Sequence, residues 1–413
     1  MRVALLTTEY PTERVFAGGL ASYVRRVGHA LAQAGHEAEV FTLSDRWERT
    51  RDGPIPLHRV PEAGEWASRA QRLPYAWRHD DFAELLGSAW RLARALRRRH
   101  REAPFDVVQA SNYRSPGLVA TVRPVAPMVT RLSSLADLWD RAYAKPPSPA
   151  ARLRSWAEAW QIRRSAAAYA PSQLLAEASA RAFGRPVRVV EPPFSVAQAT
   201  AAVGLPPPGF APESYGLFFG SMGLLKGCDR LVRVLPDLLD RCPDLRFVFV
   251  GRVFRSALGD PFDECIARAL GSYGDRVVVL RERQHSELFP LVAHARVVVL
   301  PSRMDNLPNS CLEAMALGRV VVATRGASFE QLITHEASGL LVPQDDDIEL
   351  AARILDAWHM APEARRRMGA AARARVERLD PRITLPPLVA LFSEVMADRR
   401  SGRRPEAARP QSP

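Results

Sequence analysis

Short runs rich in β-branched and other apolar residues alternate with amphipathic stretches along most of this 413-residue chain. In such a pattern each buried strand is followed by a covering helix that returns the chain to the next parallel strand. The sequence therefore predicts an α/β protein built on parallel sheets. The runs that predict strands form two sets, the first at 3–7, 39–42, 107–110 and 128–131, and the second at 216–219, 247–250, 277–280, 297–300, 320–323 and 340–342.

A proline-rich stretch separates the two sets of strands and has few periodic apolar positions, which is typical of a linker. The length of the chain also favours two domains over one. We therefore expect a Rossmann-like domain over 1–198, a linker over 199–212 and a second Rossmann-like domain over 213–380, the two facing each other across a cleft that holds the ligands. Residues 381–400 predict a C-terminal helix that packs back on the first domain, and residues 401–413 predict a disordered basic tail.

The composition excludes several classes of protein. No apolar run approaches the roughly 18 residues of a membrane helix, and the N-terminal segment lacks the long apolar stretch of a signal peptide. The four cysteines are scattered without a C-x-x-C pair, which argues against a zinc site or a disulfide framework and favours a reducing cytoplasm. We therefore expect a cytoplasmic protein. Its net charge of +12 favours anionic partners, whether nucleic acid, anionic lipid or phosphorylated small molecules.

The first candidate ligand-binding segment is the glycine pair Gly18-Gly19, which follows the first predicted strand and opens a predicted helix. Glycines at this place let the backbone approach a ligand closely, and a helix N-terminus offers unpaired N–H groups to an anion. The pair does not form the G-x-G-x-x-G pattern of dinucleotide-binding proteins. A tight strand-to-helix turn is the other interpretation.

The second segment runs from Gly220 to Gly227 and again lies between a predicted strand and a predicted helix. It does not match a P-loop, because no glycine precedes Lys226 and no serine or threonine follows it. Only two of the 57 basic residues are lysines. A lysine beside glycines at a strand end is well placed to meet a diphosphate as a point charge. A solvated surface lysine is the alternative.

The third segment, 300–318, carries two carboxylates eight residues apart, Asp305 in a loop and Glu313 at the expected start of a helix. Ser310 and Glu313 have the spacing of a capping box, which would give Glu313 a purely structural task. The functional interpretation places a phosphate at this helix N-terminus and lets both carboxylates accept hydrogen bonds from sugar hydroxyls.

Taken together and in this order, the segments resemble the retaining GT-B glycosyltransferases of family 4. That family has a Gly-Gly loop near the N-terminus, a loop ending in Lys-Gly, a Pro-Ser strand end, and an E-x7-E pair whose second Glu opens a helix. The residues that carry the resemblance here are Gly18-Gly19, Gly220, Lys226-Gly227, Pro301-Ser302, Asp305 and Glu313.

The resemblance implies transfer of a sugar from a nucleotide diphosphate-sugar to an acceptor hydroxyl with retained configuration, in glycan, glycolipid or glycosylated-metabolite biosynthesis. The second domain would bind the donor and the first the acceptor, whose identity stays open. No metal or other cofactor is expected. The resemblance implies catalytic roles for Lys226, Asp305 and Glu313. It implies donor-binding roles for Gly18, Gly19, Gly220, Ser221, Lys226, Asn306, Leu307, Pro308, Asn309, Ser310 and Glu313.

The chain also departs from the family pattern. Ser221 stands where the family has a phosphate-binding arginine, so more of the diphosphate charge falls to Lys226, with Arg303 or Arg252 as candidate second cations. The first acid is the shorter Asp305. Residues 130–134 lack the histidine that many members have there, and Arg131 or Ser133 is the candidate replacement.

Other functions remain open at this point. One is another GT-B enzyme, such as a nucleotide-sugar epimerase or a phosphorylase. A second is a basic nucleic-acid-binding protein, although the arginines are spread along the chain without a recognisable motif, so we expect no nucleic-acid partner. Separately, 82–99 predicts an amphipathic helix that either rests on an anionic membrane or presents a solvated face. Its arginines are Arg91, Arg94, Arg97, Arg98 and Arg99.

Overall fold

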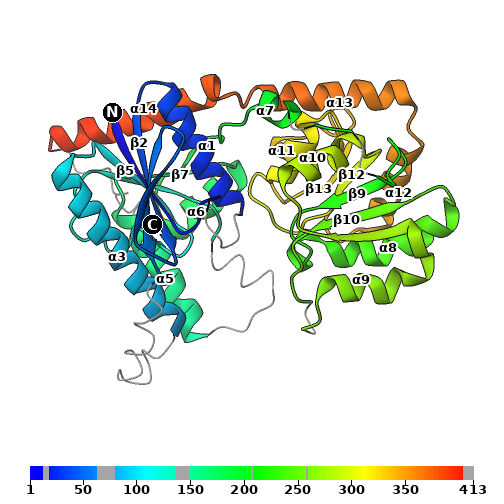
Figure 1. The fold of residues 1–413 in the computed structure, drawn as a ribbon, viewed down its shortest axis with the longest axis horizontal. Coiled ribbons are helices and arrows are strands. Elements are labelled where there is room, and N and C mark those ends of the chain that lie inside the picture. The colour runs from blue at the N-terminus through cyan, green and yellow to red at the C-terminus, as the bar shows by residue number, and fades with distance from the viewer. Residues whose placement is uncertain are drawn as a thin grey trace, which may run out of the picture. The chain divides into compact units, whose positions relative to one another are not determined.

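The computed structural model describes residues 1–12, 18–62, 80–135, 148–201, 203–205, 208–256 and 259–402 (Figure 1). The chain folds into two compact units. The first unit comprises Met1–Pro193 together with Pro381–Pro413, and the second comprises Phe194–Asp380. Each unit contains a sheet with helices on both faces, which confirms the predicted α/β class.

The sheet of the first unit has the strand order β3-β4-β2-β1-β5-β6-β7-β8, with every neighbouring pair parallel except the edge pair β3–β4. Its strands are β1 (Arg2–Thr7), β2 (Glu37–Ser44), β3 (Glu48–Asp52), β4 (Ile55–Pro61), β5 (Val107–Ser111), β6 (Met128–Arg131), β7 (Ala167–Ala170) and β8 (Arg188–Val189). Its helices are α1 (Gly19–Gln33), α3 (Asp80–Glu102), α5 (Pro149–Arg164), α6 (Gln173–Phe183) and α14 (Pro381–Arg400). Helices α1 and α14 cover one face of the sheet, and α3 packs on the other.

The sheet of the second unit is wholly parallel, with the strand order β11-β10-β9-β12-β13-β14. Its strands are β9 (Gly216–Phe219), β10 (Phe247–Gly251), β11 (Val277–Arg281), β12 (Val297–Leu300), β13 (Val321–Thr324) and β14 (Leu340–Val342). Its helical segments are α7 (Val196–Ala201), η2 (Leu224–Lys226), α8 (Cys228–Arg241), α9 (Phe262–Leu270), η3 (Gly271–Arg276), α10 (His285–His294), α11 (Asn309–Ala316), η4 (Phe329–Gln331), α12 (Asp347–His359) and α13 (Pro362–Glu377). The strand order reverses between β9 and β12, where ligands bind in open α/β sheets.

The boundary between the units lies earlier than the predicted linker. Phe194 already belongs to the second unit, where its N–H donates to the Leu379 carbonyl at 2.8 Å. Val196 and Ala199 of α7 are buried in the core of the same unit. The prediction of a linker over 199–212 was therefore wrong at its start, because two apolar side chains one helical turn apart suffice to fix this short helix to the core.

The C-terminal helix α14 belongs to the first unit. Its Leu388 and Phe392 share one hydrophobic cluster with Leu5 of β1 and Tyr23 of α1. Figure 1 shows α14, in red, beside the blue α1. Residues 403–413 of the predicted tail lie outside the described residues. In the part of the chain that the structure describes, no helix is long and apolar enough to span a membrane.

Candidate active site

The site in the second unit forms where the strand order of its sheet reverses. Strands β9 and β12 are parallel neighbours, so the loops that follow them leave the same edge of the sheet side by side. The first loop runs from Gly220 through η2 to Gly227 and then into α8. The second begins at Pro301 and leads into α11. The strand order thus brings together two loops that are about 80 residues apart in the sequence.

The two loops are in direct backbone contact. Gly227 has a φ of 71°, and a Cβ built on it would lie 2.0 Å from the Pro301 carbonyl oxygen. Only glycine therefore fits at this position. Next to this contact, the Arg303 N–H donates to the Leu225 carbonyl at 2.9 Å. These contacts fix the loop that holds Lys226 against the loop that holds Asp305.

Lys226 and Asp305 form an ion pair between the two loops. The Asp305 carboxylate is also held by its own loop, since one oxygen accepts from the Asn306 N–H at 3.0 Å and the other from the Ser302 hydroxyl at 3.4 Å. The Lys226 side chain remains 27% exposed, against 11% for Asp305. An ammonium has three donors, so this pairing leaves Lys226 with donor capacity on a solvent-accessible side.

Arg303, one of the two candidate second cations, binds protein groups in the structure. Its guanidinium donates to both carboxylate oxygens of Asp229, at 2.6 and 2.7 Å, and to the Leu224 carbonyl at 2.8 Å. Burial raises the pKa of the Asp229 carboxyl, but hydrogen bonds from Arg303 and Arg233 outweigh that effect and hold the pKa below its usual value. Arg303 is thus part of a bidentate clamp that ties the second loop to η2 and the start of α8.

The start of α11 differs from the predicted capping box. The helix begins at Asn309 after the N-cap Pro308, so Ser310 is its second residue and makes no capping bond. Glu313 lies a turn further on, too far along the helix to reach back to an N-cap N–H. The capping-box interpretation was therefore wrong. Leu307 precedes this start with a φ of 53°, a left-handed conformation that is unusual for a buried leucine.

The Glu313 carboxylate instead has His285 as a neighbour. The Glu313 side chain is 13% exposed, and its Oε1 lies 3.7 Å from Nε2 of His285, the first residue of α10. The sequence analysis did not identify His285, because no spacing pattern connects it to Glu313. The two residues meet only because α10 packs against α11.

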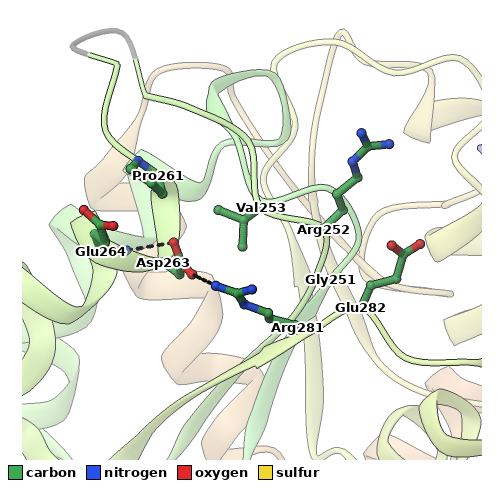
Figure 2. Close-up of a pocket in the computed structure, with 8 residues that line it drawn as sticks. All are labelled: Gly251, Arg252, Val253, Pro261, Asp263, Glu264, Arg281 and Glu282. Carbon is green, nitrogen blue, oxygen red and sulfur yellow. Dashed lines mark hydrogen bonds and ion pairs between the residues drawn. The ribbon is translucent and has the colours of Figure 1, made fainter. Parts of the chain in front are cut away.

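A pocket of about 370 Å³ lies at the carboxyl ends of β10 and β11 (Figure 2). One wall carries the ion pair between Asp263 and Arg281, 3.6 Å apart, and Figure 2 shows Arg252 and Glu282 on the opposite side. The full set of lining residues is Gly251, Arg252, Val253, Pro261, Asp263, Glu264, Arg281 and Glu282.

Gly251 brings the end of β10 against β9, since a Cβ on it would meet the Gly220 carbonyl oxygen at 1.7 Å. Gly220 itself has a φ of 132°, and the half-buried Ser221 follows it.

The glycine pair and the candidate histidine replacements lie in the first unit. Gly18 is the N-cap of α1, Gly19 is its first residue, and the Gly18 N–H donates to Glu9 Oε2 at 3.3 Å. Arg131, at the end of β6, is 7% exposed, with its guanidinium carbon 3.7 Å from the centre of the Tyr23 ring. It donates to the Ser133 hydroxyl at 3.0 Å. The two candidates therefore bind each other.

Among the described residues, no group of three or more His, Cys, Asp and Glu side chains gathers as metal ligands do.

Comparison with known proteins gives a consistent result over both units. Residues 213–359 match the family described as Glycosyl transferases group 1, and residues 17–198 match the one described as Glycosyltransferase Family 4. The D-inositol 3-phosphate glycosyltransferase of Streptomyces scabiei is 26% identical, over 94% of this chain and 89% of that protein. The protein of the same name from Mycolicibacterium smegmatis is 27% identical, over 94% of this chain and 91% of that protein.

Solved structures share the fold of the whole chain. The sucrose-phosphate synthase of Thermosynechococcus elongatus superposes with a TM-score of 0.76 at 22% identity, over 96% of this chain and 99% of that one. Anabaena HepE, solved in complex with UDP and glucose, superposes with a TM-score of 0.68 at 17% identity, over 95% of this chain and 100% of that one.

Proposed function

Because this chain belongs to the retaining GT-B glycosyltransferases of family 4, we propose that its second unit binds the diphosphate of a nucleotide-sugar donor between Lys226 and the start of α11. The observation that carries the proposal is the partly exposed Lys226–Asp305 ion pair at the point where the strand order reverses. A cation there, beside a helix that lacks a side-chain cap, is suited to an anionic ligand.

Donor binding would exchange one partner of Lys226 for another. In the structure Asp305 neutralises the ammonium. A bound diphosphate brings two or more negative charges to the same group and competes for its donors. Asp305 then turns from a counter-ion into an acceptor for hydroxyl groups of the donor sugar. Its reach is short, since its own loop already holds both carboxylate oxygens.

The chemical step requires stabilisation of the charge that develops on the departing diphosphate. Lys226 supplies a full positive charge, and the first N–H groups of α11, at Asn309 and Ser310, add the positive end of the helix dipole. These groups are fixed before the reaction by the contact of Gly227 with Pro301 and by the Arg303–Asp229 clamp. We propose that they act without a metal ion.

Glu313 and the pocket beside β10 and β11 complete the proposed donor site. Glu313 performs no capping task, so its carboxylate is available to accept hydrogen bonds from the ribose hydroxyls. The pocket that Arg252, Arg281 and Glu282 line is the proposed place of the nucleobase. Gly220, Ser221, Asn306, Leu307 and Pro308 shape the backbone between these groups.

The acceptor is proposed to bind the first unit, beside Gly18 and Gly19 at the start of α1. A lipid-linked acceptor would in addition require that unit to contact a membrane.

The test is thermal stabilisation of the purified protein by UDP, GDP, ADP, CDP and dTDP. A diphosphate at a hundred times its dissociation constant adds about 2.7 kcal/mol to the unfolding free energy, which raises the melting temperature by a few degrees. We expect one diphosphate to give this shift, Lys226→Ala to abolish it, and Arg241→Ala to retain it. Arg241 is the matched control, because it forms an ion pair with Asp237 on the exposed surface of α8. No shift with any diphosphate, or a shift that survives in Lys226→Ala, would contradict the donor site.

A further inference from the structure

Two neighbouring helices of the first unit each carry an exposed line of side chains spaced by four residues or nearly so. On α3 the line contains a leucine, a tryptophan and then arginines, and on α5 it contains two tryptophans between arginines. We call these eight residues the α3–α5 face. They are Leu86, Trp90, Arg94 and Arg98 of α3, and Arg152, Trp156, Trp160 and Arg164 of α5.

The apolar part of the α3–α5 face is unusually exposed for side chains of this kind. The exposed fractions are 41% for Leu86, 44% for Trp90, 50% for Trp156 and 36% for Trp160. A spacing of four residues keeps such side chains on one side of a helix. Soluble proteins seldom place several tryptophans together in contact with water, so a grouping of this kind indicates an interaction surface.

The two lines lie on helices that are in direct contact. Helices α3 and α5 pack against each other, as Figure 1 also shows. The Phe82 ring at the start of α3 lies edge-on to the Trp156 ring, with centroids 6.4 Å apart, and the Trp160 ring follows at 5.4 Å from that of Trp156. The contact of Phe82 with Trp156 thus joins the start of α3 to the exposed line of α5.

Arginines accompany the tryptophans of this face. The guanidinium of Arg94 lies 5.6 Å from the centre of the Trp90 ring, and that of Arg164 lies 5.1 Å from the Trp160 ring. The Arg98 side chain is 82% exposed. A guanidinium stacked on an indole keeps its N–H groups directed outward toward an anion.

Of the carboxylates of these helices whose side chains are described, Glu84 and Glu158 lie away from the face, and Glu102 reaches only its end at Arg98. Glu158 of α5 is buried, and Glu84 of α3 pairs with Arg114. Glu102, at the end of α3, lies within 4 Å of Arg98 and Arg99. The central part of the α3–α5 face therefore carries positive charge.

The structure also corrects which arginines of α3 belong to such a surface. Arg91 donates to the backbone carbonyls of Pro61 and Glu62, and Arg99 binds the buried carboxylate of Glu39. Arg97 reaches the Arg123 carbonyl at 3.5 Å. Arg91 and Arg99 are structural, since their charges are directed into the unit. Of the five arginines that the sequence suggested, Arg94 and Arg98 lie on the exposed line.

We propose that the α3–α5 face binds the surface of an anionic lipid bilayer. Indole rings favour the interface between headgroups and acyl chains, where the ring meets an apolar phase and its N–H stays hydrated. Arginines within a Debye length of anionic headgroups are attracted to the membrane surface. The combination on helices that lie along a surface is that of a peripheral membrane protein. This inference concerns a surface of the first unit and does not rest on the donor site.

The test is co-sedimentation with vesicles of phosphatidylcholine, with and without 30 mol% phosphatidylglycerol. We expect binding to the anionic vesicles alone, weakened as salt rises, because the headgroup attraction is screened. We expect the combined variant Trp90→Ala, Trp156→Ala, Trp160→Ala, and separately Arg94→Glu with Arg98→Glu, to bind at least tenfold more weakly. Circular dichroism and an unchanged melting temperature establish that each variant remains folded.

Matched controls distinguish binding through this face from nonspecific hydrophobic or electrostatic binding to the vesicles. Trp47→Ala removes a tryptophan that is 59% exposed in the connection between β2 and β3, and Arg241→Glu with Arg268→Glu makes the same charge change in the second unit. Both controls should bind vesicles as the wild type does. The proposal is overturned if the wild type does not bind anionic vesicles at low salt, or if the controls lose binding equally. Binding of a single-stranded oligonucleotide through these residues, without vesicle binding, would assign the face to nucleic acid instead.

Discussion

Two ion pairs of the second unit join the loop after β12 to the segment after β9, yet they are built differently. The Arg303–Asp229 pair is bidentate, and the Arg303 guanidinium also donates a hydrogen bond to the Leu224 carbonyl. The Lys226–Asp305 pair has a single cationic contact, and its ammonium is partly exposed. The first pair has little capacity left for a ligand, whereas the second keeps donors available. The two cations therefore differ less in charge than in how many of their N–H groups are already hydrogen-bonded. Arg303 stabilises the loops, whereas Lys226 still has N–H groups for a ligand.

The residue types fit this division. A guanidinium is planar and matches a carboxylate with two parallel bonds, which suits a fixed clamp. An ammonium is a compact point charge on a flexible stem, so it can leave one anion for another at low cost. In a chain with only two lysines, one of the two stands at this site. We infer that an arginine at 226 would bind Asp305 too firmly to release it.

The largest effect should come from removing the ligand-facing cation. Lys226→Ala should lower kcat/KM for sugar transfer about 100-fold, equivalent to about 2.7 kcal/mol, because the departing diphosphate loses the cation of these loops that keeps N–H donors for a ligand. Steady-state kinetics with matched circular dichroism measures this. Near-wild-type turnover in a folded Lys226→Ala protein would show that the difference between the two ion pairs has no effect on catalysis.

The structural pair should behave in the opposite way. Arg303→Ala should lower the unfolding free energy of the second unit by about 2 kcal/mol, a value reduced from that of fully buried pairs because both side chains are partly exposed. Denaturant titration followed by hydrogen exchange of the α8 and β12 amides locates the loss in this unit. The affinity of the folded fraction for the diphosphate should change by less than about threefold, and a larger change would place Arg303 in contact with the donor.

Glu313 extends the comparison to a carboxylate that caps no helix and has His285 as its neighbour. Glu313→Gln should reduce transfer about tenfold, or about 1.4 kcal/mol, while the unfolding free energy stays within about 0.5 kcal/mol of the wild type. The expectation follows from the absence of a capping bond at α11. Activity and melting temperature measured on the same preparation of Glu313→Gln test this expectation. A variant with full activity and a destabilised helix would restore the capping role.

The smallest effect concerns pH. The pKa of Asp229 is lowered in the folded state, so its ion pairs contribute stability above the unfolded-state pKa of about 3.9 and lose it as the pH falls through the folded value. Denaturant unfolding between pH 7 and pH 3 should therefore show a shallower decline for Asp229→Asn than for the wild type. Equal slopes would mean that Asp229 is not the titrating group that couples this clamp to stability.

The sequence predicted those parts of the fold that one element determines by itself. Buried strands such as Val297–Leu300 are runs of β-branched residues, and the structure has this strand at its predicted bounds. Strand β3, with the sequence ERTRD, was missed because an edge strand with polar side chains lacks that signal. Strand β7 was missed because Ala167–Ala170 has too few β-branched residues to mark a strand.

The sequence predicted which loops form the site but not which side chains contact one another there. Glycines and a lysine after β9 indicate a ligand loop, and their positions in the chain suffice for that inference. Whether Arg303 faces a ligand or Asp229 depends on packing between segments about 75 residues apart, which no local pattern encodes. The same holds for His285 beside Glu313. The Ser310–Glu313 spacing misled because the helix starts two residues earlier than a capping box with Ser310 as N-cap requires.

The return of α14 to the first unit has a consequence for how the protein is made. Residues 194–380 form a continuous segment inserted within the first unit, whose core is completed only by side chains such as Leu388 and Phe392. During synthesis on the ribosome, the second unit can emerge and fold while the first still lacks one layer of its core. The first unit must then wait, with Leu5 and Tyr23 incompletely covered, until the last helix leaves the exit tunnel. A stop codon shortly before residue 381 would thus spare the later-encoded unit and harm the one encoded first.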